Sequence, residues 1–401
     1  MPEVLVGRQP IYDAELEVYA YELLFRTAGS LEANVTDGDL ATSQVILNTF
    51  MEIGIDRLAG DKLVFINLTR NFITGKYPIP LPPDRVVLEI LEDITIDKEL
   101  EEAVGELVEQ GYIIALDDIV EIDSIASLLG KTSIVKLEIL GMDKADLRNY
   151  ATTLKRKGIK ILAEKVETHE EFEYCKMLGF DYYQGYFLSK PNIVEGKKIL
   201  ESKFTVLRLL SELQDPDLEI KKLEKVISQD VSLSYKLMRL INSVHYGTKE
   251  RVNSLRQALT LLGLRQIKQW IGLIFLTRVE DKPKELMITA MVRAKMCEVI
   301  APLMGYRNAE AGFTVGLFSV LDALLDMPLE DVLKQLPLSD ETNSALLEHK
   351  GKLGAVLLCV IAYEQGDWDE MEFPKVGKNK LMEAYLEAID WASSVGSELE
   401  D

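Results

Sequence analysis

The sequence is poor in residue types on which several protein classes depend. Its 401 residues include only three cysteines, three histidines and three tryptophans. The cysteines, Cys175, Cys297 and Cys359, lie far apart and form no CxxC pair. This spacing argues against a disulfide framework and predicts reduced thiols in the core of a cytoplasmic protein. The scarcity of histidine and cysteine also argues against a zinc site.

Long apolar runs and net positive charge are missing as well. The longest apolar stretches, such as GAVLLCVIAY, are shorter than the roughly 20 residues that cross a bilayer. The opening MPEVLVGRQP contains an acid and lacks the basic region and apolar core of a secretory signal. A net charge of -21 repels nucleic acids and anionic lipids at long range, but a pocket with local cations can still hold a small phosphorylated ligand. We therefore expect a cytoplasmic protein without nucleic-acid partners or membrane insertion.

What is present is a globular composition in two parts. Hydrophobic residues make up 47% and charged residues 28% of a chain long enough for two domains. Residues 1–193 alternate strand-like runs rich in Val, Ile and Tyr with amphipathic stretches such as DKELEEAVGELVEQGY. The alternation predicts an α/β fold of parallel strands joined by helices, with enough units to close a barrel. The runs are LVGRQPIY, KLVFINL, RVVLEI, YIIALDDI, SIVKLEI, IKILAEKV and YYQGYFL.

Residues 194–401 have a different period. Stretches such as SLSYKLMRLINSV and VNSLRQALTLLGLRQIKQWIGLIFL repeat apolar residues at helical spacing, and no strand pattern interrupts them. The junction KPNIVEG is short and has no Gly/Ser run. The sequence thus predicts a barrel followed by an all-α domain.

Polar or ionisable residues stand at the ends of almost all predicted strands. Alone, an Asp or Asn at such a place often caps the next helix. A series of six favours a shared pocket, because the carboxyl ends of the strands in a β/α barrel meet at one rim. The series consists of Asn67, Glu89, Asp117 with Asp118, Lys136, Glu164 and Gln184.

These side chains suit chemistry on a phosphodiester. Oxygen ligands favour Mg²⁺ or Mn²⁺ over zinc. Two such cations activate water and neutralise a phosphodiester. The expected ligands are Glu22, Asn67, Glu89 and Asp117, with Asp118 toward a second cation.

Three further residues complete this hypothesis. Lys136 would add positive charge near the phosphate, Glu164 would accept a proton from water, and Arg26 would bind a phosphate. From these residues alone, a purely structural ion pair between Lys136 and Glu164 is an equal alternative.

The same residues lie in motifs that resemble the EAL domain, the family of cyclic-di-GMP phosphodiesterases and receptors. YELLFR resembles its EALLR signature, FINLT its strand with the metal-binding Asn, LEILED its ELTES segment and ALDDI its DDFG segment. VKLE resembles KID, AEKVET resembles AEGVET, GRQPIYD resembles the opening RQPI, and QGYFLSKP resembles QGY with its trailing SKP. The likeness covers about 190 residues in the family's order.

The resemblance implies specific roles. It implies metal ligation by the carboxylates and Asn67 named above, support from Lys136 and Glu164, and ligand contacts from Gln9, Glu167 and Gln184. It implies a TIM-like barrel with one antiparallel strand, cyclic di-GMP as ligand, a two-metal site if the protein is active, and a homodimer.

The sequence departs from the family at three places. The family's FGTGYSS loop after the double aspartate, which braces the metals, reads IVEIDSIAS here. Glycines permit backbone angles that other residues avoid, so this loop should hold the second metal differently. In addition, Lys165 replaces a glycine and Glu138 replaces the aspartate of KID.

The second half resembles the HDOD domain, a helical relative of HD phosphohydrolases. The resemblance lies in LSELQDPDLEIKKLEKVISQDVSLSYKLMRLINSVHYG and in VNSLRQALTLLGLRQIKQW. No His-Asp dipeptide exists, and GLFSVLD stands where the hydrolases have GLLHD. We therefore expect no metal and no HD hydrolase activity here, but a regulatory domain with a protein partner.

Three interpretations remain open from the sequence. The barrel is a slow cyclic-di-GMP phosphodiesterase, or it is an inactive receptor for cyclic di-GMP, or both halves form a scaffold for other proteins. The four oxygen ligands disfavour the scaffold, and the changed loop after Asp118 favours the receptor modestly.

Overall fold

The chain forms two compact units, residues 1–188 with 364–366 and residues 189–363 with 367–401. The predicted boundary after residue 193 lies outside the residues that the structure describes. This computed structural model describes residues 4–27, 53–92, 94–117, 119, 125–190, 227, 237, 255–276, 282–336, 338–368 and 376–400. In these ranges no helix combines the length and apolar character needed to span a membrane.

The first unit contains a closed barrel of eight strands in the order of the sequence. The strands are β1 (Val4–Tyr12), β2 (Val18–Thr27), β3 (Leu63–Leu68), β4 (Val86–Ile90), β5 (Ile113–Leu116), β6 (Ile134–Glu138), β7 (Lys160–Glu164) and β8 (Tyr182–Tyr183). β1 runs antiparallel to both of its neighbours, β2 and β8, and every other neighbouring pair is parallel. The predicted barrel with one antiparallel strand is confirmed.

Two strands differ from the sequence prediction. β2 is an eighth strand that the seven apolar runs did not include, since its glutamate and arginine obscure the strand pattern. β8 is shorter than YYQGYFL and is followed by a 3-10 turn, η2 (Phe187–Ser189). Gly185 has φ +150°, and a Cβ there would overlap the backbone of Val166. The bend at this position therefore requires glycine, because a residue with a Cβ would overlap its neighbours.

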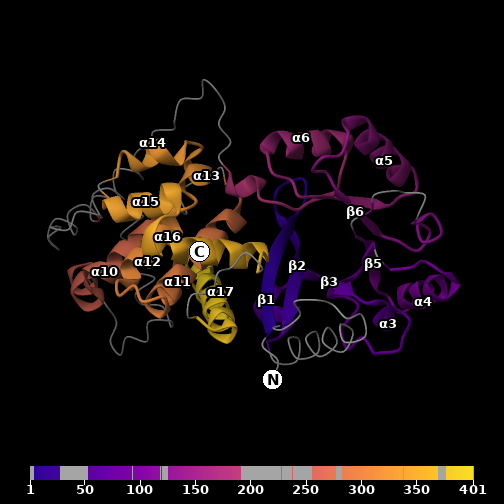
Figure 1. Cartoon of the computed structure of the whole chain (residues 1–401), viewed down its shortest axis with the longest axis horizontal. Coiled ribbons are helices and arrows are strands. Elements are labelled where there is room, and N and C mark those ends of the chain that lie inside the picture. Colours follow the sequence, from indigo (N-terminus) through magenta and orange to yellow (C-terminus); the bar gives the residue numbers. More distant parts are fainter. Residues whose placement is uncertain are drawn as a thin grey trace. The chain divides into compact units, whose positions relative to one another are not determined.

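Helices cover the outside of the barrel (Figure 1). They are α2 (Ile55–Ala59), α3 (Arg70–Ile73), α4 (Lys98–Glu109), α5 (Lys144–Arg156) and α6 (His169–Leu178). α4 follows the predicted amphipathic pattern and buries Leu100, Val104 and Leu107 on one face. Its N-cap, Asp97, accepts a hydrogen bond from the Leu100 N–H and forms an ion pair with Arg70.

An apolar layer closes the barrel interior below its mouth. Tyr182 of β8 packs against this layer. The layer itself consists of one buried residue from each of the other seven strands: Ile11, Ala20, Phe65, Val87, Ala115, Ile134 and Leu162. Side chains two residues apart on a strand point to the same face. The inward positions next to this layer, toward the carboxyl ends of the parallel strands, therefore form a second layer.

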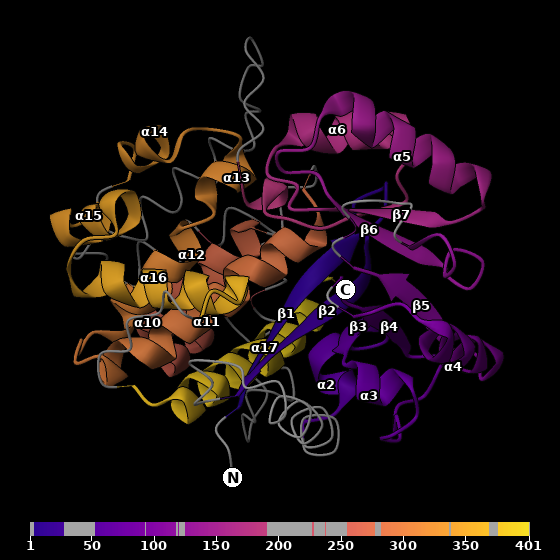
Figure 2. The same cartoon turned by 45° about the vertical axis from the view of Figure 1, so that its right-hand side comes forward.

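Helices are the one kind of regular secondary structure in the described residues of the second unit (Figure 2). Its helices are α10 (Leu255–Leu276), α11 (Lys284–Leu303), α12 (Ala309–Phe318), α13 (Leu321–Leu325), α14 (Leu329–Leu333), α15 (Asp340–Glu348), α16 (Gly351–Gln365) and α17 (Lys378–Glu400). α10 is interrupted at Gly263, where φ is +74°. The predicted helical half is confirmed for these residues.

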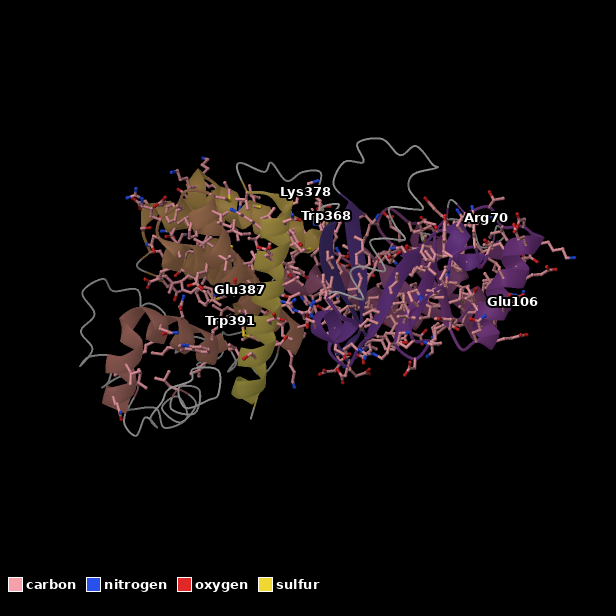
Figure 3. The ribbon with its side chains drawn as sticks, turned by 90° about the horizontal axis from the view of Figure 1, so that it is seen from below. Arg70, Glu106, Trp368, Lys378, Glu387 and Trp391 are labelled. Atoms are coloured by element: carbon pink, nitrogen blue, oxygen red, sulfur yellow. The ribbon has the colours of Figure 1, made fainter. Side chains whose placement is uncertain are left out.

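Aromatic packing ties three helices of this unit together. Trp391 of α17, labelled in Figure 3, lies 6.1 Å from the ring centre of Trp270 in α10 and 5.9 Å from that of Phe313 in α12. Glu387, one turn earlier, pairs with Lys295 of α11. Trp270 and Trp368 are buried, and so are all three cysteines, as the sequence predicts for the thiols.

Candidate functional site

A layer of polar side chains lies directly above the apolar layer of the barrel. On each parallel strand it stands two residues beyond the apolar residue, and on antiparallel β1 two residues before it. Its members are Gln9, Glu22, Asn67, Glu89, Asp117, Lys136, Glu164 and Gln184. The layer thus contains one residue that lies in, or directly after, each of the eight strands. Gln9 and Glu22 belong to it in addition to the strand-end residues predicted from the sequence.

Three carboxylates in this layer are spaced for a shared cation. Glu22, Glu89 and Asp117 are buried, and each offers an oxygen within 4.8 Å of the other two. They are the one such acidic group among the residues that the structure describes. Beside them the Asn67 amide donates to Glu22 Oε1 at 3.3 Å, which directs its Oδ1 elsewhere.

Several buried oxygens of the layer have no hydrogen-bond donor within the described part of the chain. They include Asn67 Oδ1, Glu89 Oε2, Glu164 Oε2 and Gln184 Oε1. Buried oxygens normally have a partner, and hard divalent cations prefer carboxylate and amide oxygens. The residues therefore fit a Mg²⁺ or Mn²⁺ ion held by Glu22, Asn67, Glu89 and Asp117.

Lys136 is the cation at the centre of the layer. Its Nζ lies 2.6 Å from Glu89, 2.8 Å from Asp117, 2.9 Å from Glu164 and 3.5 Å from Glu22. The side chain is 1% exposed. The structural ion pair between Lys136 and Glu164 is present, but it is one part of a five-residue cluster. Four carboxylates against one ammonium leave an excess of negative charge when all are ionised, which further cations would balance.

Burial and charge shift the pKa values in the cluster. Burial opposes the charge of Lys136, but the surrounding carboxylates outweigh it and raise the pKa of Lys136 well above its usual value. Burial raises the pKa of Glu89 well above its usual value despite the attraction of Lys136. Burial likewise raises the pKa of Glu164 to about 8. Glu164 can therefore exchange a proton near neutral pH.

A chain of amides holds Glu22 in place. The Gln184 Nε2 donates to Glu22 Oε2 at 2.7 Å and to Gln9 Oε1 at 3.1 Å. The Gln9 Nε2 in turn donates to the hydroxyl of Tyr186 at 2.8 Å. Sequence reasoning did not include Tyr186. Its signal in the sequence is its place in the QGY motif, two residues after Gln184, because β8 ends before both residues.

Three predicted site residues are not among the described members of this layer. Asp118 and the side chain of Arg26 lie outside the described residues, as does most of the IVEID segment. Glu167 lies in the turn between β7 and α6, where its backbone N–H donates to Glu171 at 2.8 Å. The second metal and the Arg26 contact therefore stay predictions.

The segment that replaces GLLHD in the helical half lies at the end of α12. Ser319 stands in it and accepts a hydrogen bond from Arg293 at 2.9 Å. Burial raises the pKa of Asp322, and the charges of Arg293 and Lys282 oppose the shift. In the described part of this segment, Ser319 thus has a hydrogen bond from Arg293, and the positive charges of Arg293 and Lys282 favour the ionised form of Asp322.

Comparisons with known proteins match both halves separately. The model of the EAL domain matches residues 22–191, and the model of the HDOD domain matches residues 202–349. The structure of a standalone EAL protein from Vibrio cholerae O395 with bound c-di-GMP covers 46% of this chain and 90% of its own, with 21% identity and a TM-score of 0.39.

Two curated proteins match nearly the whole chain. The uncharacterized protein YuxH of Bacillus subtilis is 34% identical over an alignment of 403 positions, which covers 98% of this chain and 98% of YuxH. The cyclic di-GMP phosphodiesterase CdgJ of Vibrio cholerae is 35% identical over 373 residues, 92% of this chain and 86% of CdgJ. The chain therefore belongs to the EAL–HDOD family, in which an EAL barrel is followed by an HDOD domain.

Proposed function

We propose that the barrel binds cyclic di-GMP together with divalent cations and hydrolyses it slowly to the linear dinucleotide. The observation that carries this proposal is the polar layer, in which three carboxylates within 4.8 Å of one another lie beside Lys136 and Glu164. The name of CdgJ, a relative over 92% of this chain, supports the choice of ligand.

The protein's own residues have distinct tasks in this reaction. Glu22, Asn67, Glu89 and Asp117 would hold a cation, which supplies polarisation of water and neutralisation of phosphate charge. Glu164, whose pKa is raised to about 8, accepts the proton of the attacking water. The oxygen of water bonds to one phosphorus and one phosphodiester P–O bond breaks. The leaving ribose oxygen takes up a proton and stays on the chain as a hydroxyl, which opens the ring.

Positioning falls to the neighbours of these residues. Lys136, protonated and in contact with Glu164 at 2.9 Å, holds that carboxylate toward the site and adds positive charge for the phosphate. Gln184 fixes Glu22 and keeps its own Oε1, buried and without a hydrogen-bond partner in the described residues, for a donor of the ligand.

We further propose that the helical half acts as a regulatory domain without hydrolase chemistry. The lack of any His-Asp dipeptide supports this role. The protein partner and the homodimer expected from the sequence belong to the same proposal, as does a cytoplasmic location.

Calorimetry with cyclic di-GMP, in Mg²⁺ and separately in Ca²⁺, tests the proposal. We expect binding in both, and linear dinucleotide on a column after incubation in Mg²⁺. Glu22→Ala should abolish the metal-dependent binding, whereas Glu15→Ala, in an exposed turn of the same hairpin, should retain it. Binding without product would make the protein a receptor, and no binding with either ion would overturn the proposal.

A further inference from the structure

Lys165 has a backbone conformation that is unusual for a lysine. It follows Glu164 directly, and its φ is +54°. A residue with a Cβ is strained in this left-handed region, and glycine is not. Lys165 is also the position at which the EAL motif AEGVET has glycine and this chain has lysine.

The unusual backbone brings the Lys165 side chain to Glu138. The Lys165 Nζ lies 2.5 Å from Glu138 Oε2, with 55% and 36% of the two side chains exposed. Glu138 is two residues after Lys136 on β6, and it is paired in register with Glu164 of β7. The ion pair therefore stands at the mouth of the barrel, one step above the polar layer.

Stability does not account for this arrangement. An ion pair this exposed contributes little to the free energy of folding, no more than the left-handed lysine costs. The pair can therefore open at little cost when another anion offers Lys165 a better contact.

A nucleotide ligand would be such an anion. The described mouth of the barrel contains the carboxylates of Glu22, Glu89, Asp117, Glu164 and Glu138. Lys136 is 1% exposed and already shared among four of them. The Lys165 side chain, by contrast, is 55% exposed and flexible, and lysine is a common ligand of phosphate.

We propose that Lys165 is a ligand-binding residue that leaves Glu138 to contact a phosphate of the bound cyclic dinucleotide, while Glu138 competes with that phosphate. This inference rests on the proposed function. It gives one shared task to Lys165 and Glu138, two residues that depart from the EAL motifs.

Calorimetry with cyclic di-GMP in Ca²⁺ on the full chain tests the inference through four variants. Lys165→Gln should weaken binding about tenfold, the loss of one charged contact to phosphate. Lys165→Arg should retain most of the affinity. Glu138→Gln should tighten binding several-fold, because Lys165 loses its competing partner, and this gain should vanish in the double variant Lys165→Gln/Glu138→Gln.

A matched control lies on the same strand. Lys160, at the other end of β7, forms a similarly exposed ion pair with Asp181 at 2.6 Å, so Lys160→Gln should leave the affinity unchanged. If the wild type binds and Lys165→Gln binds equally well, the inference is wrong and the proposed function stands. If Glu138→Gln weakens binding as much as Lys165→Gln does, the pair is a structural brace and the inference is also wrong. If the wild type does not bind, both proposals fall.

Discussion

Lys136 is the residue on which the charge balance of the barrel mouth depends. It contacts four carboxylates and is itself 1% exposed. Removing one partner from a buried ion cluster leaves the remaining charges unpaired and costs far more than the loss of a surface pair.

Lys136→Met should therefore lower the free energy of unfolding by about 3–5 kcal/mol in chelator. Millimolar Ca²⁺ should restore more stability to this variant than to the wild type, because the carboxylates then lack their internal cation. Denaturant unfolding measures both effects. Lys160→Met, which breaks the exposed pair with Asp181, should cost no more than about 1 kcal/mol. Equal losses for the two variants would contradict the buried cluster.

Glu164 predicts a pH dependence of stability. Its pKa of about 8 in the folded chain exceeds the usual glutamate value. The folded state therefore binds more protons than the unfolded state between the two values, and the free energy of unfolding should fall as the pH rises through this window.

Thermal unfolding in EDTA at pH 5 to 8 measures this dependence. Glu164→Gln cannot ionise, so its unfolding temperature should fall less over the same range, with Glu89 contributing the remainder. A variant profile as steep as that of the wild type would show that Glu164 titrates elsewhere.

At the scale of elements, the short strand β8 and the bend that follows it position Gln184 in the site. β8 has two residues, and the bend after it holds Gln184 against Glu22 at 2.7 Å. The bend depends on Gly185, where a Cβ would overlap the backbone of Val166 between β7 and α6.

Gly185→Ala should therefore displace Gln184 and weaken cyclic-di-GMP binding at least tenfold, with a loss of stability of roughly 1–3 kcal/mol from overpacking. Gly130→Ala is the control, because a Cβ at Gly130 meets no atom within 4 Å and its backbone is not left-handed. Calorimetric affinities and unfolding temperatures of both variants measure the difference. Unchanged affinity in Gly185→Ala would separate this bend from the site.

At the scale of the whole molecule, ligand binding to the folded barrel alone should stabilise the chain. A ligand at a hundredfold excess over its dissociation constant adds about 2.7 kcal/mol. Cyclic di-GMP with Ca²⁺ should thus raise the unfolding temperature of the wild type and leave Glu22→Ala unchanged. Duplex DNA should produce no shift, because the net charge of -21 repels it. A shift with DNA would contradict the exclusion of nucleic acids drawn from the composition.

The amino-acid sequence determined much of the candidate site in advance. Asn67, Glu89, Asp117, Lys136, Glu164 and Gln184 were found as strand ends, because strand period and barrel geometry together place such residues on one rim. The motifs of both halves identified the EAL and HDOD domains. The apolar period also predicted which face of a helix is buried, as α4 illustrates.

Only the tertiary structure decided which of these residues touch. Lys136 contacts four carboxylates rather than Glu164 alone. Tyr186 extends the chain of amides through Gln9. Lys165, directly after β7, contacts Glu138 on the neighbouring strand β6. β2 and the bend at Gly185 also escaped sequence patterns. The physical reason is that period reports the face on which a side chain lies, whereas its partners depend on barrel closure and on backbone angles that neighbouring strands impose.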